Sequence, residues 1–152
     1  MNSDPKTQHD STAVEFRSAR LDAAADVQLA VDEATSHKNA IILVHVDWAP
    51  MVPQRRRFEA FVLAYRTKNP EHEIAFRYID CTPVCGGYEP LRSIPGWQVL
   101  EQINGGGSLL HGYGELAWIK NNRVLHVQRP LDFESVDALI DKTESLEMAN
   151  GD

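Results

Sequence analysis

Two cysteines are the residues of this chain whose type and spacing could do redox chemistry. Cys81 and Cys85 are separated by a short segment containing Pro83, so the loop between them is bent and the two sulfurs could meet. Such a pair could exchange disulfides if one thiol were an accessible thiolate. The alternative is two reduced, structurally incidental cysteines, as in most intracellular proteins. Because the paired ligand spacing of a zinc site is missing, we expect no metal and no cofactor.

An arginine triplet is the second chemical candidate. Arg55, Arg56 and Arg57 fall on the first turn of a predicted helix, where free N–H groups and the helix dipole favour anions. Three guanidinium groups there would make a small-anion site. The alternative is a solvated face whose arginines pair with nearby carboxylates such as Glu59 and Glu71.

A third candidate pair is polar and close in sequence. His45 and Asp47 share one face of a predicted strand, because strand side chains alternate with a period of two. No serine or cysteine nucleophile stands beside them, so a hydrogen-bonded polar pair is expected rather than a catalytic dyad. The chain also lacks a glycine-rich cofactor fingerprint and a carboxylate pair spaced for general acid and base roles. We therefore expect no catalytic residue outside the cysteine alternative.

Composition limits the class of protein. The chain has 152 residues, of which 43% are hydrophobic, and this fits one globular domain. Its net charge of −7 repels phosphate and argues against a general binder of nucleic acid or anionic membranes. Residues 1–12 are polar and do not resemble a signal peptide, and no segment has the apolar length of a membrane span. These features predict a cytoplasmic location.

The elements that must position these residues follow from hydrophobic periodicity. A disordered tail over residues 1–12 precedes a predicted strand at 13–19. Asp22 is then expected to cap a helix that ends near Lys38-Asn39. The run from Ile41 to Val46 is apolar and β-branched, which is typical of a central parallel strand. A helix with Pro53 in its first turn, stopped by Asn69-Pro70, and a strand at 73–79 follow.

The second half of the chain predicts an antiparallel unit. A helical stretch over residues 91–103, interrupted by Pro95-Gly96, lies in a long connection from 81 to 114. Two strands at 116–120 and 123–127 flank Asn121-Asn122, a pair suited to a two-residue hairpin turn. Asp132 or Ser135 then caps a terminal helix, and residues 147–152 are expected to fray.

Three short strings, combined with this element order, carry a family resemblance. They are Val44-His45-Val46-Asp47-Trp48-Ala49 before the second helix, Tyr78-Ile79-Asp80, and Ile119-Lys120-Asn121-Asn122-Arg123-Val124. Over residues 13–146 the chain resembles the thioredoxin-like superfamily. The resemblance implies an α/β fold with three layers, α/β/α, around a central mixed sheet of four to five strands, with an extended connection before the C-terminal hairpin.

The same resemblance implies a degenerate active site. Counting from Trp48-Ala49 puts the two sulfur positions of the family's Cys-x-x-Cys motif on Val52 and Arg55, which cannot form thiolates. The family's cis-proline before the hairpin falls on Gly114 or Glu115. Its buried aspartate falls on Val46.

We therefore expect a non-catalytic binding or accessory module. Its groove, formed by residues 48–57, 81–87 and 112–115, would hold an extended peptide or a small anion. The expected binding residues are Trp48, Met51, Val52, Pro53, Arg55, Arg56 and Gly114. One alternative is a thiol-disulfide oxidoreductase that uses Cys81 and Cys85. Another is a structural subunit that docks through the connection at 81–114, unless this connection only packs Trp97, Leu100 and Leu110 over the sheet edge. The partner is expected to be a protein or peptide, and neither nucleic acid nor membrane.

Overall fold

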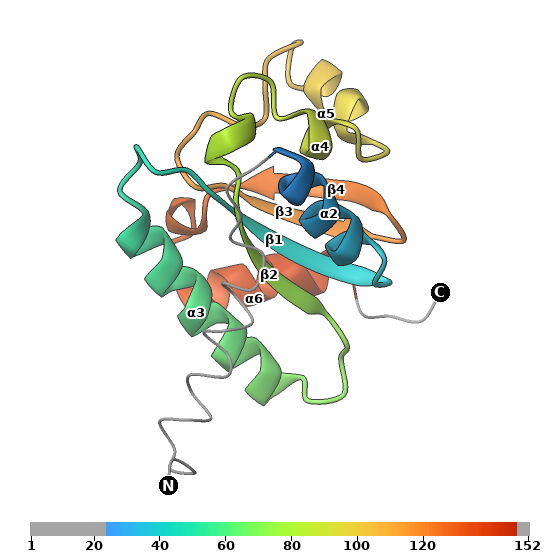
Figure 1. Ribbon diagram of the computed structural model, residues 1–152. Helices are drawn as coiled ribbons and strands as arrows, with labels where there is room; N and C mark the ends of the chain where they lie inside the picture. The colour runs from blue at the N-terminus through green and yellow to red at the C-terminus, as the bar shows by residue number, and fades with distance from the viewer. Residues whose placement is uncertain (1–23, 149–152) are drawn as a thin grey trace, which may run out of the picture.

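The computed structural model describes residues 24–148 (Figure 1). The predicted tail at 1–12, the strand at 13–19, the Asp22 cap and residues 149–152 lie outside the described residues. Helices and strands alternate along the first half and a hairpin follows. In chain order the elements are α2 (Ala24–Thr35), β1 (Asn39–His45), α3 (Met51–Lys68), β2 (Ala75–Asp80), η1 (Thr82–Val84), α4 (Glu89–Arg92), α5 (Trp97–Ile103), β3 (Leu116–Lys120), β4 (Arg123–Gln128), η2 (Pro130–Asp132) and α6 (Val136–Ser145).

The sheet is mixed and is built around β1. Its four described strands lie in the order β2-β1-β3-β4, and β1 runs parallel to β2 and antiparallel to β3. Ile42, for example, lies between Arg77 of β2 and Ala117 of β3. Every residue of β1 is buried. The prediction of a central strand is therefore confirmed, as is the mixed α/β sheet.

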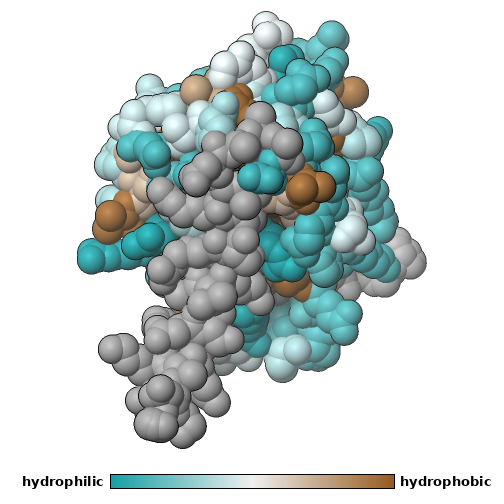
Figure 2. All heavy atoms as spheres, viewed as in Figure 1, coloured by the Kyte–Doolittle hydropathy of each residue, from teal (hydrophilic) through white to brown (hydrophobic). Residues whose placement is uncertain are grey.

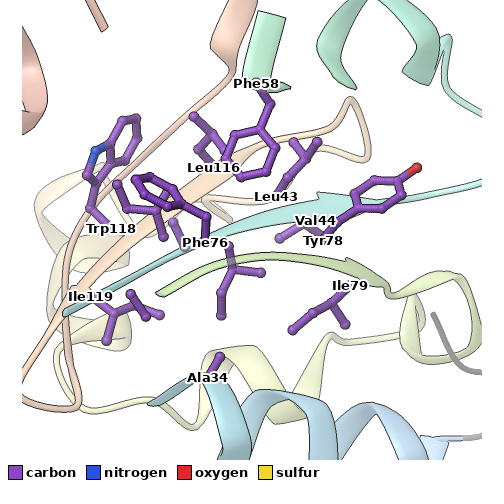
Figure 3. Close-up of a cluster of buried hydrophobic side chains, with 14 of the residues drawn as sticks. Ala34, Leu43, Val44, Phe58, Phe76, Tyr78, Ile79, Leu116, Trp118 and Ile119 are labelled. Carbon is purple, nitrogen blue, oxygen red and sulfur yellow. The ribbon is translucent and has the colours of Figure 1, made fainter. Parts of the chain in front are cut away.

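Helices cover both faces of this sheet. In Figure 1, α2 lies on one face, and α3 and α6 lie on the other. Figure 3 shows Ala34 of α2 and Phe58 of α3 on opposite sides of the strands. The α3 side is aromatic, with the ring of Phe58 6.3 Å from that of Phe76. On the same side Trp118 Nε1 of β3 donates to Thr143 Oγ1 of α6 at 3.0 Å. These contacts make three layers, α/β/α.

Local signals set most element ends. Asn121 and Asn122 adopt φ of 52° and 57°, which the predicted two-residue hairpin turn requires. Ser135, not Asp132, caps α6 by accepting from the Ala138 N–H at 3.1 Å.

Two predicted boundaries need correction. The first helix ends at Thr35 rather than near Lys38-Asn39, because Asn39 already pairs with Lys120 as the first residue of β1. Residues 147 and 148 were expected to fray, but Met148 is buried and Lys120 Nζ donates to the Glu147 carbonyl at 2.8 Å. Both corrections have the same cause, since tertiary pairing overrides the local pattern at chain ends and turns.

The connection between β2 and β3 packs onto the domain. Trp97 and Leu110 are buried and Leu100 packs against the core, as the packing alternative predicted. Within residues 24–148, no helix combines the length and the apolar character that crossing a bilayer requires.

The buried position of Val44 in β1 gives a test of this fold. An unpaired charge there costs several kcal/mol, against a total stability of about 5 to 15 kcal/mol. We expect Val44→Asp to unfold the domain, measured by circular dichroism on thermal melting. The matched control is Val99→Asp on α5, because Val99 is exposed and should tolerate the change. A Val44→Asp protein that melts like wild type would rule out this position for β1.

Candidate functional site

The candidate site forms where two loops meet at the carboxyl end of β1. The first loop leaves β1 at His45 and enters α3 at Met51. The second loop, residues 111–115, precedes β3. Backbone pairing holds the two together, because the Val44 N–H donates to the Glu115 carbonyl at 2.9 Å. Trp48 Nε1 adds a side-chain link by donating to the Gly112 carbonyl at 3.1 Å. This edge is where α/β proteins commonly place binding sites.

Gly114 makes the closest approach between the loops. Its φ is +90°, and an added Cβ would lie 2.9 Å from Met51 Sδ and 3.2 Å from Gln54 Cγ. Only glycine fits both this backbone conformation and this distance. Gln54 also bridges to η2, since its Oε1 accepts from the Leu131 N–H at 3.2 Å. Met51 and Gln54, three positions apart on one helix face, therefore face the loop before β3.

At Gly114 the closest side chains are Met51 and Gln54, and not the two residues selected by counting from Trp48-Ala49. Val52 and Arg55 were expected at the two sulfur positions, but Val52 is exposed and Arg55 Nε lies 3.8 Å from Glu59 Oε2. The residues opposite Gly114 are one position earlier, because α3 begins at Met51. Met51 carries a thioether and Gln54 an amide, and neither group can form a thiolate.

Polar side chains converge beneath the first loop. His45 Nε2 lies 2.7 Å from Asp47 Oδ1, its Nδ1 is hydrogen-bonded to Tyr78 Oη, and Asp80 Oδ1 accepts from the Thr82 N–H at 3.1 Å. Ligand atoms of His45, Asp47 and Asp80 lie within 4.8 Å of one another, so among the described residues these three could hold a divalent cation. Sequence analysis missed Asp80 as a member, although His45 and Asp80 are register partners at the ends of adjacent parallel strands.

Four exposed apolar side chains surround the place where the loops meet. Trp48, Val52, Tyr113 and Leu131 are 55%, 51%, 52% and 43% exposed, and we call them the apolar rim. Figure 2 shows brown and tan atoms at the left edge, where Figure 1 places the start of α3. Sequence analysis named Trp48 and Val52 and included Tyr113 in the groove segment 112–115, but it missed Leu131, because hydropathy does not show which loop residues become neighbours.

The arginine triplet does not converge on a common point. Arg57 Nη1 donates to the Phe133 carbonyl at 2.8 Å, on the α6 side of α3. Arg55 is near Glu59, as described above, and Arg56 is exposed. Pro53 is also exposed and has no N–H to offer an anion. This arrangement matches a solvated face better than an anion site.

The two cysteines occupy different environments. Cys81 is buried and Cys85 is exposed, and both are free thiols. Burial raises the pKa of the Cys81 thiol to about 12, and the nearby Asp80 charge acts in the same direction. Cys81 is therefore protonated at neutral pH, where it is a poor nucleophile.

The new register can be tested by restoring sulfur. We expect Met51→Cys with Gln54→Cys to form an internal disulfide under mild oxidation, because both side chains face the same side of the first turn of α3. The matched control is Val52→Cys with Arg55→Cys, the pair that the sequence alignment chose. Free-thiol titration and mass spectrometry measure both. A disulfide in the control pair alone, with a native melting temperature, would favour the original alignment.

Comparisons with known proteins support the fold and nothing further. No family model and no curated protein matches the chain. Among solved structures, the zinc-bound form of human ERp44 matches with a TM-score of 0.51 and 16% sequence identity, over 84% of this chain. The chain spans 31% of that structure. At this identity the likeness concerns architecture, and the domain described above has a thioredoxin-like fold.

Proposed function

We propose that this domain is a non-catalytic binding module that holds an extended peptide against the apolar rim. The observation that carries the proposal is the exposure of Trp48, Val52, Tyr113 and Leu131 around the contact of Gly114 with α3. Exposed aromatic side chains are common anchors in protein interfaces, since they bury large areas at low entropic cost. Clustered at one edge, they suit a peptide better than a small polar metabolite.

The backbone beside the rim supports an extended ligand. Over residues 24–148, no intrachain hydrogen bond engages the backbone N–H or C=O of Tyr113, one residue before Gly114. Unpaired backbone groups at the margin of a sheet can pair with an added strand, and alternate side chains of that strand then fill pockets. A peptide crossing here would contact Trp48 on one side and Tyr113 on the other.

Several alternatives receive less support. A small anion is disfavoured because Arg55 and Arg57 point to different partners. A disulfide exchanger is disfavoured because the buried Cys81 thiol has its pKa raised to about 12. Nucleic acid and membranes stay outside the proposal, because the net charge is −7. With free thiols and no thiolate at the site, a reducing, cytoplasmic setting fits the proposal.

Peptide selection tests the proposal directly. A cysteine-free random peptide library is selected on the wild-type protein, and the enriched peptides are measured by tryptophan fluorescence. Trp97 and Trp118 are fully buried, so Trp48 is the indole that bound peptide should shield from acrylamide. We expect Val52→Asp to weaken binding by about tenfold or more, because it places a charge in the apolar rim.

The design separates loss of binding from loss of folding. An acidic residue in the first turn of a helix is tolerated, so Val52→Asp should melt like wild type. Val99→Asp carries the same change on an exposed helix outside the rim and should bind normally. The proposal is contradicted if no peptide is enriched, or if the enriched peptides bind Val52→Asp as tightly as wild type.

Thiol chemistry gives a separate prediction. We expect iodoacetamide at pH 8 to modify Cys85 and leave Cys81 unreacted in the folded protein, because the high pKa and burial of Cys81 suppress the thiolate. Raising the pH toward 12 or adding denaturant should expose Cys81 to alkylation. Peptide mapping by mass spectrometry measures both sites. The protein should also fail to accelerate insulin reduction by dithiothreitol. Turnover that disappears in the Cys81→Ser, Cys85→Ser protein would instead support the oxidoreductase.

A further inference from the structure

One carboxylate oxygen next to the rim has no hydrogen-bond partner among the described residues. Glu115 is 3% exposed, and its Oε2 accepts from the His111 N–H at 3.1 Å. Its Oε1 is buried and, among the described residues, has no hydrogen-bond partner. Leaving a buried carboxylate oxygen without a hydrogen bond is costly, so this oxygen calls for a donor that the described residues do not supply.

A second buried glutamate has hydrogen-bond donors at both of its carboxylate oxygens. Glu101 is 7% exposed and accepts from Arg92 Nε and Nη2 at 3.0 and 2.8 Å and from Trp97 Nε1 at 3.2 Å. These donors lower the pKa of the Glu101 carboxyl, led by the Arg92 hydrogen bond. Glu115 has a comparable burial with one backbone donor. The contrast marks Glu115 as the unusual carboxylate.

Glu115 lines a pocket that adjoins the apolar rim. The pocket has a volume of about 310 Å³, and its other lining residues include Leu109, His111, Tyr113 and Val127. Tyr113 belongs to both the pocket and the rim. A peptide lying along the rim would therefore pass the pocket and could insert one side chain into it.

The arginine that lines the pocket already has partners. Arg129 Nη2 lies 2.8 Å from Asp132 Oδ1, and its guanidinium lies 5.4 Å from the centre of the Tyr113 ring. The two carboxylates of Glu115 and Asp132 outnumber this one guanidinium. A ligand with one positive charge would therefore balance the charges of these three groups.

We propose that this pocket binds the ammonium group of a lysine side chain of the bound peptide, with Glu115 as its anion partner. The proposal rests on the proposed function and names the ligand class of that site. Leu109 and Val127 offer apolar contact to an aliphatic stem, Glu115 lines the same pocket, and its buried Oε1 is the acceptor without a hydrogen-bond partner among the described residues. Because Oε2 is already bonded to His111, a point-charge ammonium fits better than a planar guanidinium, which prefers two free carboxylate oxygens.

Small probes test the pocket without a known peptide. n-Butylammonium, n-butanol and n-propylguanidinium are titrated at low ionic strength and followed by amide NMR. We expect n-butylammonium to shift the amides of His111, Tyr113 and Glu115, with weaker shifts from n-propylguanidinium and none there from n-butanol. Glu115→Gln should reduce n-butylammonium affinity by about tenfold or more, whereas the exposed Glu134→Gln should bind as wild type.

Stability separates a ligand site from a structural ion pair. If Glu115 waits for a ligand, Glu115→Gln should melt at or above the wild-type temperature, because the variant removes an unpaired buried charge. If instead Arg129 pairs with Glu115 in solution, Glu115→Gln and Arg129→Gln should both melt lower, and that result overturns the proposal. Equal shifts from n-butylammonium and n-butanol would overturn it as well.

Peptides distinguish this inference from the proposed function. Peptides selected on the rim should carry a lysine whose replacement by norleucine weakens binding to wild type but not to Glu115→Gln. Rim-binding peptides with no such lysine, together with no n-butylammonium shift, would refute the pocket while leaving the binding module standing. An n-butylammonium site in a protein that enriches no peptide would refute the binding module while supporting the ammonium pocket.

Discussion

The double constraint on β1 is what the rest of the structure depends on. β1 is hydrogen-bonded on both edges, to β2 and to β3, and covered on both faces by helices. The position and direction of the carboxyl end of β1 are therefore fixed. The loop that follows leads from this end into α3, which begins at Met51. The bond from the Val44 N–H to the Glu115 carbonyl then brings the loop before β3 to the same point. Both loops of the candidate site are therefore positioned by β1.

At the carboxyl end of β1, the backbone of Gly114 lies close to the first turn of α3. Gly114 lies against Met51 and Gln54 so tightly that any side chain would collide with the thioether. Neither a thioether nor an amide can attack a disulfide, so the side chains that contact Gly114 offer no group for disulfide exchange. The exposed side chains of the apolar rim, and the Tyr113 backbone without an intrachain hydrogen bond over residues 24–148, are the features that support the proposed peptide binding.

Polar groups in and near the site differ in whether they have hydrogen-bond partners. His45 is hydrogen-bonded to Asp47 and Tyr78, Asp80 accepts from the Thr82 N–H, and Glu101 is held in a network with Arg92 and Trp97. Such networks contribute to a unique packing because every member is satisfied. Glu115 departs from this rule beside the rim, the same surface that other observations mark for binding. A local departure from polar satisfaction is expected where a ligand completes the structure.

The sequence by itself determined the elements whose signals are local. β-branched residues in β1 and Asn121-Asn122 in the hairpin act through neighbours within a few residues, so pattern and propensity suffice, whereas the sequence left Asp132 and Ser135 open as the cap of α6. Only the tertiary structure decided the register at the site, where Met51 and Gln54 rather than Val52 and Arg55 face Gly114. It also decided that Leu131 lies beside Gln54 and that Glu115 Oε1 has no hydrogen-bond partner among the described residues. These depend on the distance between segments far apart in the chain, which no local pattern encodes.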